Sequence, residues 1–394
     1  MMRLIRGGGV LVLLAGGPAL LAGQDTTMVQ GGIYRRPFIA EAGRTAVGGY
    51  LEANAAWSRT DGVSEGPTSD LQRFNIFLFS SLGPRLRFTS ELEFESGGEE
   101  IRIETAVLDF ELHPALVLRG GVLLPPIGAF NVNHDGPRYE FVARPIVATE
   151  IIPATLSEAG FGAFGRFGTG RLSFSWDAYL TNGLNSGVVL NDQGRTRLAS
   201  GKGISLFEDD ENSSPALSGR VAARHPLLGE LGLSHYRGIW NVFRLEGETV
   251  DDKRWLSLTA VDLETAVGPV DLRGEVAFAR IDLPPDLRES LGDRQWGIYL
   301  DAVTTVLRPE IRGLVNPEVR FGVRLERADF NQGRFSSTGR PRFDDRDAVS
   351  FALSFRPVPE TVFRLNYRLE RVRDLQGNPA QHTAAVQAGV ATYF

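Results

Sequence analysis

The sequence has 394 residues, no cysteine and a formal net charge of -6 at pH 7. The lack of cysteine excludes a disulfide-stapled scaffold and a lipoprotein anchored through an N-terminal cysteine, and the acidic balance argues against nucleic acid as a partner. The high glycine and phenylalanine content, 45 and 24 residues, suits a sheet whose two faces meet different solvents.

The first residues have the layout of a cleavable secretory signal. Arg3 and Arg6 precede an apolar run from Val10 to Leu21, and small residues follow it. We therefore expect residues 1–23 to be removed, leaving one domain over residues 24–394. An N-terminal membrane anchor is the alternative, but the run is shorter than the roughly 20 apolar residues that a spanning helix needs and is interrupted by glycine and proline.

The rest of the chain consists of short segments in which apolar and polar residues alternate. In the segment RLRFTSELEFES, which begins at Arg85, Leu86 and Phe88 fall on one face and Glu91 and Glu93 on the other, the pattern of a β-strand. About sixteen segments of about ten residues follow this pattern, the number and length expected of a large transmembrane antiparallel β-barrel. The predicted strands cover residues 46–58, 71–81, 85–96, 100–112, 115–123, 157–167, 171–181, 216–224, 230–238, 254–263, 269–281, 294–307, 317–329, 346–356, 361–372 and 381–394.

The predicted connections alternate between tight turns and longer polar loops. Long loops are expected at residues 59–70, 124–156, 182–215, 239–253, 282–293, 330–345 and 373–380, with a short exception at residues 97–98. Short periplasmic turns and long extracellular loops are the pattern of bacterial outer-membrane barrels. Aromatic residues near the strand ends fit the two interfacial girdles, and the terminal Phe394 resembles the signal for insertion of such barrels.

The charged faces of the predicted strands would line the lumen. Charge on a narrow aqueous path sets ionic preference, and arginine suits anions because its planar guanidinium matches carboxylate and phosphate geometry. The alternative is that these arginines pair with acids on neighbouring strands and only keep the wall polar. The candidate pore-lining residues are Arg85, Arg87, Glu91, Glu93, Arg171, Arg220, Arg224, Arg273, Arg320, Arg324, Arg364 and Arg368.

One irregular segment, Gly121 to Pro153, is long enough to suggest a functional loop held by the scaffold. It and the strand after it resemble the outer-membrane porins of the phosphate-selective O/P type. The matching motifs are a Pro-x-Gly-x-x-Asn corner, an arginine-proline pair and a strand that starts with proline and is rich in glycine: Pro126, Gly128 and Asn131, then Arg144 and Pro145, then Pro153, Gly160 and Gly162.

The resemblance implies a sixteen-stranded barrel, commonly trimeric, whose third extracellular loop folds into the lumen. On that basis residues 124–156 form the constriction loop. Phosphate-selective members have a lysine-rich constriction, whereas this loop contains no lysine, so the resemblance implies a general or weakly anion-preferring pore. The candidate constriction residues are His134, Asp135, Arg138, Glu140 and Arg144.

Other chemistry finds little support. The five histidines have no metal-ligand spacing, and Ser234 and His235 are adjacent, hence on opposite faces of a strand and a poor catalytic pair. The acidic cluster at residues 208–212 has ligands suited to calcium, but a solvated acidic loop is the simpler interpretation. No catalytic residue, metal site or cofactor is predicted.

These patterns predict an outer-membrane porin for passive diffusion of small anionic or neutral hydrophilic solutes or ions. The expected location is the bacterial outer membrane, the expected partners are outer-membrane lipid and two further copies of the chain in a homotrimer, and no nucleic acid is expected. Three alternatives stay open: a barrel enzyme acting on lipids, which needs a Ser/His pair on the lipid-facing rim, a soluble secreted β-sandwich that binds carbohydrate, and a barrel plugged by its long loops.

Overall fold

The computed structural model describes residues 40–42, 44–203, 205–208 and 210–394. The predicted signal peptide, residues 1–23, lies outside the described residues, so its cleavage stays a prediction. Within the described part of the chain, no helix is long and apolar enough to cross a membrane.

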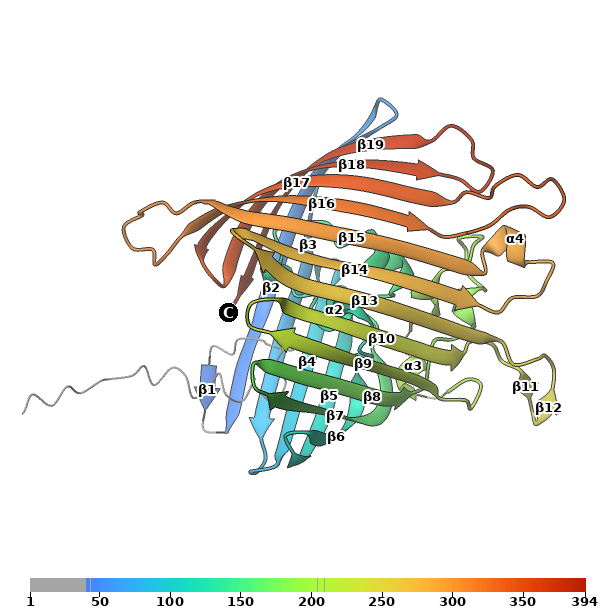
Figure 1. The fold of residues 1–394 in the computed structure, drawn as a ribbon, viewed down its shortest axis with the longest axis horizontal. Coiled ribbons are helices and arrows are strands. Elements are labelled where there is room, and N and C mark those ends of the chain that lie inside the picture. Colours follow the sequence, from blue (N-terminus) through green and yellow to red (C-terminus); the bar gives the residue numbers. More distant parts are fainter. Residues whose placement is uncertain (1–39, 43, 204, 209) are drawn as a thin grey trace, which may run out of the picture.

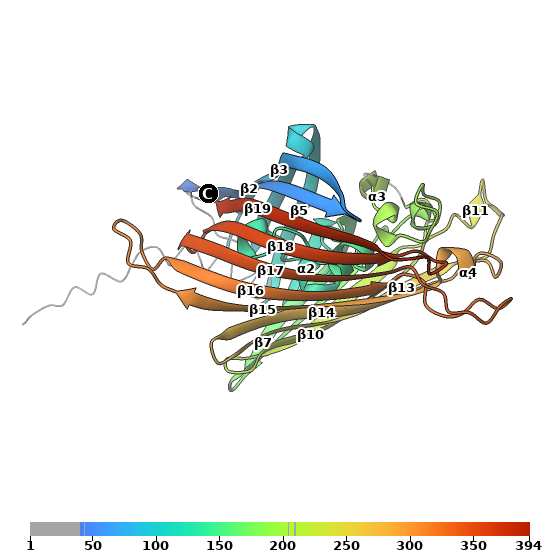
Figure 2. The ribbon, with the colours of Figure 1, turned by 90° about the horizontal axis from the view of Figure 1, so that it is seen from above.

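Sixteen antiparallel strands close into one barrel (Figures 1 and 2). Each strand pairs with the next along the chain, and β19 pairs with β2 to close the barrel. A short strand β1 (Ala40–Ala42) also pairs with the start of β2. The barrel strands are β2 (Thr45–Thr60), β3 (Val63–Ser81), β4 (Leu86–Glu95), β5 (Glu100–His113), β6 (Leu116–Leu123), β7 (Glu158–Thr169), β8 (Leu172–Thr181), β9 (Ala216–His225), β10 (Gly229–Ile239), β13 (Trp255–Val267), β14 (Val270–Ile281), β15 (Arg294–Leu307), β16 (Glu318–Asp329), β17 (Asp345–Val358), β18 (Thr361–Arg373) and β19 (Gln381–Tyr393).

The alternation in sequence appears as two different faces of the sheet. On β4, Glu91 and Glu93 are buried inside the barrel while Leu92 is exposed on the outside. The same holds on β18, where Leu365 is exposed and Asn366 is buried. An apolar outer face on a closed antiparallel barrel is the architecture of bacterial outer-membrane proteins, because closure leaves no unpaired strand edge in the lipid. The predicted fold class and membrane location are confirmed.

One rim carries short turns, apart from a longer connection at residues 308–317, and the other carries most of the long loops (Figure 1). By the general rule for these barrels, the short turns face the periplasm and the long loops the outside. The prediction of a loop over residues 59–70 is wrong, because β2 and β3 continue to a tight turn at Asp61 and Gly62. Both turn residues have positive φ, 49° and 89°. The hairpin tip is polar on both faces, so it lacks the alternation that identifies strands in lipid.

The long-loop rim also holds short elements. A hairpin of β11 (Arg244–Leu245) and β12 (Glu248–Thr249) follows β10, and helix α4 (Arg288–Leu291) follows β14. A 3-10 turn, η4 (Ser96–Gly98), joins β4 to β5. These elements lie at the rim, and Leu291 of α4 also packs against the apolar cluster described below.

The loop of residues 124–156 folds into the lumen, as predicted. It contains α2 (Gly128–Asn131), a 3-10 turn η5 (Gly136–Arg138) and a π-helical turn η6 (Val147–Ile151). The backbone N–H of Phe130 donates to Glu275 Oε1 on β14 at 2.6 Å, and that of Ile146 donates to Glu326 Oε1 on β16 at 2.7 Å. Figures 1 and 2 both show α2 enclosed by the strands.

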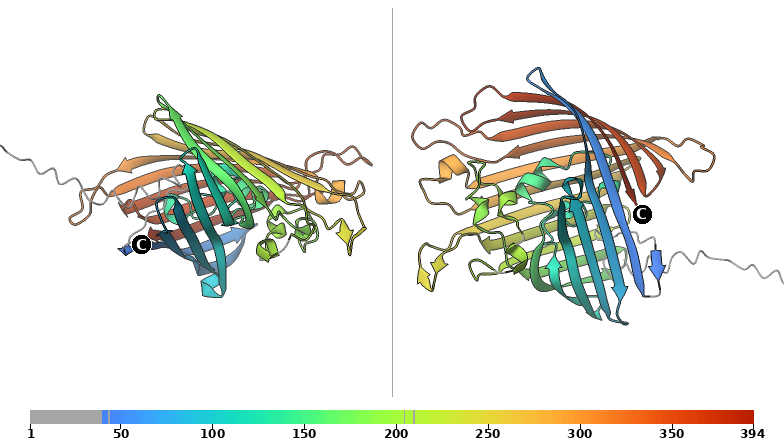
Figure 3. Two further views of the ribbon diagram at one scale, coloured as in Figure 1. Left: turned by 90° about the horizontal axis from the view of Figure 1, so that it is seen from below. Right: turned by 180° about the vertical axis from the view of Figure 1, so that it is seen from behind.

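A second loop, residues 182–215, also enters the long-loop end of the barrel, which the sequence did not predict. It contains η7 (Ser186–Val188), η8 (Leu198–Gly201) and α3 (Ser205–Glu208), and Figure 3 shows it in green at the end that carries β11 and β12. Its Val188 and Leu198 are buried in one apolar cluster with Ile151 of the first loop and Leu258 and Tyr299 of the wall. One side of the lumen, along β10 and β13–β15, is therefore a packed apolar core.

Candidate pore constriction

The constriction loop is held to the opposite wall by charged side chains. Glu140 accepts hydrogen bonds from Arg320 Nη1 at 3.0 Å and Arg356 Nε at 2.9 Å, on β16 and β17. Arg364 of β18 donates through Nη1 to the carbonyl of Phe141 at 3.1 Å. Because these contacts involve three consecutive strands, they fix the position of residues 136–144 across the lumen.

The wall arginines are themselves mostly paired with carboxylates on neighbouring strands. Arg324 makes a bidentate contact with Asp301, 2.6 and 2.7 Å, and still donates to the carbonyl of Ala143 at 2.6 Å. Arg220 pairs with Asp262 in the same way, with Nε 3.0 Å from Oδ2. A charge pair across strands holds both side chains in register and reduces the field that either projects into the lumen.

Two cavities lie on either side of the loop. The one toward the long-loop rim has a volume of about 570 Å³ and is lined by β2, β3 and loop residues Val142 to Arg144. The one toward the short-turn rim, which we call the lower cavity, has a volume of about 330 Å³ and is lined by loop residues Arg138 to Phe141 and by β14–β16. Each cavity shares loop residues with a much smaller space between them, which we call the neck.

The neck is the smallest of these three spaces. Its lining includes Tyr139, Phe141 and Arg144 from the loop, Glu52 from β2 and Arg324 from β16, and its volume is only about 10 Å³. A cavity of roughly 10–15 Å³ holds a single water molecule. The neck therefore has room for about one water molecule.

The five predicted constriction residues do not share one environment. Arg144 and His134 border the neck, Arg138 and Glu140 border the lower cavity, and Asp135 is buried with its carboxylate accepting a hydrogen bond from Tyr393 at 2.9 Å. His134 also contacts the barrel wall, with its Nε2 2.9 Å from Glu104 Oε1 of β5. Among the five, Arg144 is therefore the arginine that borders the neck.

The predicted lining residues fall into three groups. Arg85 and Arg171 are exposed in short turns, because each strand begins one residue later than the alternation suggested, and their placement in the lumen is wrong. Arg224 is exposed at the short-turn rim and borders the lower cavity. The others lie on the inward face: Arg87, Glu91, Glu93, Arg220, Arg273, Arg320, Arg324, Arg364 and Arg368.

Sequence reasoning missed Glu52, the wall carboxylate of the neck. Its Oε1 is 2.8 Å from Arg364 Nη2, and its Oε2 is 3.7 Å from Arg73 Nη1. The alternation of side chains along β2 could have identified Glu52, because Tyr50 and Asn54, two residues away on either side, also face inward. Arg73 was missed as well, and it pairs further with Glu93 at 3.1 Å.

Two cations at the upper side of the loop contrast with these paired arginines. Arg144 Nη1 donates to Thr155 Oγ1 at 3.4 Å, and Lys202 Nζ of the second loop donates to the carbonyl of Thr155 at 3.1 Å. Across the described residues, neither cation has a carboxylate within 4.0 Å. Burial and the nearby Arg144 lower the pKa of Lys202 to about 8, while Glu95 and Glu93 of β4 oppose this and Arg102 of β5 adds to it.

The catalytic and metal-binding alternatives considered from the sequence have no assembled site in the described residues. Ser234 is buried and donates to the carbonyl of Ala260, whereas His235 is exposed on the outer face beside Thr259. Within the described ranges, no group of three or more His, Asp or Glu side chains is arranged to hold a metal ion. The acidic cluster at 208–212 includes position 209, which lies outside those ranges, so calcium binding there stays untested.

The fold is shared with known outer-membrane proteins. No protein-family model matches the sequence. A protein of Aquifex aeolicus (strain VF5) described as uncharacterized is 27% identical over 366 residues, which covers 86% of this chain and 78% of that protein.

Among solved structures, OmpF of Salmonella typhi in complex with daunomycin is 11% identical with a TM-score of 0.56, covering 91% of this chain and 100% of its own. The anion-selective porin from Comamonas acidovorans is 13% identical with a TM-score of 0.53, covering 89% and 99%. At these identities the similarity establishes a common fold, a closed barrel of the outer-membrane porin type.

Proposed function

We propose that this chain is an outer-membrane porin through which small hydrophilic solutes or ions diffuse passively. The observation that carries the proposal is the pair of cavities on either side of the inward loop, both of which share lining residues of that loop with the neck. A lumen with a loop-made constriction and walls of both charges admits water and small ions and excludes larger solutes. The size of the neck indicates a small conductance.

We further propose a weak preference for anions. Most wall arginines are neutralised by carboxylates, so the unpaired Arg144 at the neck and Lys202 above it would dominate the local field. The resemblance to phosphate-selective porins points the same way, and so does the similar fold of a porin described as anion-selective. The lysine comes from the second loop and not from the constriction loop, so specificity for phosphate is not part of the proposal.

A homotrimer, implied by the same resemblance, is also proposed. Chemical cross-linking of the detergent-purified barrel tests it directly. A ladder that ends at three chains supports the trimer, and a single monomer band excludes it.

A barrel kept shut by its loops is the second candidate, and the neck volume of about 10 Å³ favours it. In that case the second loop acts as a plug, since its apolar residues complete the core on one side of the lumen. The enzyme alternative has less support, because Ser234 and His235 point to opposite faces of β10.

Planar-bilayer recording separates these candidates. The purified protein should give small, stable current steps, and the reversal potential under a salt gradient should show a modest anion preference. Arg144→Ala should lower that preference and raise the conductance, since it removes both charge and volume from the neck. Arg85→Ala, which changes an exposed arginine in a short turn, is the matched control. A correctly folded barrel without current steps would favour the plugged barrel.

A further inference from the structure

The cavity toward the long-loop rim, which we call the upper cavity, has the size of a small-molecule site. Its volume of about 570 Å³ lies within the range of roughly 300–1,000 Å³ that is typical of such sites. Arg144 of the constriction loop borders both this cavity and the neck. A solute that enters the lumen from the long-loop rim therefore meets the upper cavity before it meets the neck.

Asp70 of β3 brings a carboxylate into the upper cavity. It is the direct cross-strand partner of Asn54, which faces the lumen and accepts a hydrogen bond from Arg364 Nη2 at 3.3 Å. Directly opposed residues on adjacent strands share one face of the sheet, so Asp70 faces the lumen too. Asp70 is exposed, and in the described part of the chain its carboxylate has no cationic side chain within 4.0 Å.

Arg144 is the corresponding cation of the upper cavity. Its Nη1 donates to Thr155 Oγ1 at 3.4 Å, and among the described residues no carboxylate lies within 4.0 Å of it. The remaining charged residue of the lining is Arg73, which already pairs with Glu93 and Glu95 at 3.1 Å each. The lining thus has one cation and one anion without an opposite charge beside them.

Uncharged amide side chains complete the polar part of the lining. They are Asn54 of β2, Gln72 of β3 and Gln387 of β19. An amide side chain both donates and accepts hydrogen bonds, as a peptide group does. The described residues around the cavity include no aromatic ring on which a sugar could stack.

We propose that the upper cavity binds small zwitterionic solutes, of which short peptides with free ends are the class that fits its groups. Asp70 would contact the ammonium end, and Arg144 would contact the carboxylate end, because a guanidinium matches carboxylate geometry. The amide side chains would hydrogen-bond to the peptide group. The inference rests on the proposed function, since solutes reach this cavity through the lumen.

Charge balance favours a zwitterion over other solutes. A simple anion at Arg144 would share the cavity with the uncompensated carboxylate of Asp70, and a simple cation at Asp70 would share it with Arg144. A neutral sugar would leave both charges without a partner. Only a solute with both signs satisfies the two groups together.

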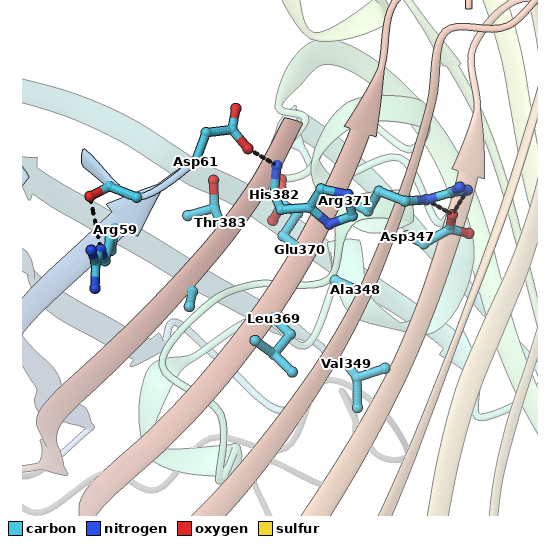
Figure 4. A pocket seen from close by; sticks show the side chains of 12 residues that line it. Arg59, Asp61, Asp347, Ala348, Val349, Leu369, Glu370, Arg371, His382 and Thr383 are labelled. Atoms are coloured by element: carbon cyan, nitrogen blue, oxygen red, sulfur yellow. Dashed lines mark hydrogen bonds and ion pairs between the residues drawn. The ribbon is translucent and has the colours of Figure 1, made fainter. Parts of the chain in front are cut away.

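A second hollow provides a contrast, because its charged groups are bound within the chain. It has a volume of about 530 Å³ and lies between β17, β18, β19 and the tip of the β2–β3 hairpin (Figure 4). There Arg371 Nε donates to Asp347 at 3.0 Å, Arg59 donates to a backbone carbonyl at 2.8 Å, and Asp61 accepts a backbone N–H at 2.9 Å. Asp70 has no such hydrogen bond recorded within the described ranges.

Saturation-transfer difference NMR of the detergent-purified barrel tests the proposal, because it measures weak binding without requiring current. The probes are glycylglycine, N-acetylglycylglycine, which lacks the ammonium group, and glycylglycine amide, which lacks the carboxylate. Glycylglycine should bind more tightly than either derivative. Retention of the heat-modifiable gel migration typical of closed barrels shows that each variant is folded.

Two single variants assign the two ends of the solute. Asp70→Asn should weaken glycylglycine binding about fivefold, the upper end for one exposed ion pair, and should not weaken binding of N-acetylglycylglycine. Arg144→Gln should weaken glycylglycine binding about fivefold and should not weaken binding of the amide. Asp286→Asn is the matched control, because it changes an exposed aspartate of a long loop that is not part of the cavity lining.

Several results would overturn the proposal. Equal binding of the three probes would exclude recognition of a zwitterion, and tighter binding of the acetylated peptide would indicate an anion site only. Equal losses for all probes in Asp70→Asn would show that the change acts on the structure. The proposed function fails separately: zwitterion binding by a barrel without current steps would support this site and exclude an open pore, whereas current steps without a preference for glycylglycine would exclude the site alone.

Discussion

Glu140→Gln tests how firmly the constriction loop is held to the wall. The carboxylate accepts hydrogen bonds from Arg320 and Arg356 at 3.0 and 2.9 Å, and it is 4% exposed. Glutamine keeps the shape and one acceptor oxygen but removes the charge. Arg320 keeps its contact with Asp271, and Arg356 keeps the carbonyls of Pro137 and Pro359.

The size of the effect follows from these two contacts. A hydrogen bond to a charged group contributes about 1.5–3 kcal/mol, roughly twice the neutral one. Loss of the charge from two such bonds therefore weakens the attachment by about 2 kcal/mol. Because 1.4 kcal/mol is a factor of ten, the ratio of attached to released loop falls about 30-fold.

Single-channel recording detects the release of the loop as a change in conductance. Glu140→Gln should show larger or flickering current steps, because release of residues 136–144 widens the neck. Glu264→Gln is the control: this carboxylate borders the same lower cavity, but it is half exposed and meets Arg273 only at 3.5 Å, so its loss should have little effect. Identical conductance in the parent and Glu140→Gln would refute the claim that this attachment limits the path.

Two further predictions concern single charges. The anion preference should fall as pH rises through about 8, because Lys202 is protonated below its lowered pKa and neutral above it. Reversal potentials at pH 6.5 and 9 measure this change, and Lys202→Arg should abolish it. A constant anion preference in the parent protein would contradict the prediction. Arg324→Met should destabilise the barrel by about 3–5 kcal/mol, because it leaves the buried Asp301 without its partner. Urea unfolding in detergent measures the loss of stability. An unchanged unfolding midpoint would contradict the prediction.

The membrane part of the fold is readable from sequence because lipid imposes a strict rule on it. Each strand must present apolar residues every second position, and Leu92 or Leu365 reveals this without any knowledge of neighbours. The hairpin tip around Asp61 obeys no such rule, since both of its faces meet water. Its strands are held by backbone pairing and polar contacts such as Trp57 to Ser64 at 2.9 Å.

The loops that fill the lumen are harder to predict from the sequence, because their positions depend on contacts between distant segments. The inward fold of residues 124–156 was predicted from a family resemblance and from the irregular length of the segment. The second loop was missed because Val188 and Leu198 lie among glycines and polar residues without periodicity, and only the closed barrel shows that they complete a core with Ile151. The pairing of arginines was anticipated as an alternative, but the exception of Arg144 required distances.

The most direct test of the account asks whether current passes through the neck. The chain has no cysteine, so Ala143→Cys places a single thiol in the lining of the neck, and Leu231→Cys places one on the exposed outer face as a control. Addition of a charged methanethiosulfonate reagent during bilayer recording should reduce the current of Ala143→Cys in discrete steps and leave that of Leu231→Cys unchanged. Full current through a labelled Ala143→Cys barrel would show that solutes take another path, and the proposed constriction would be wrong.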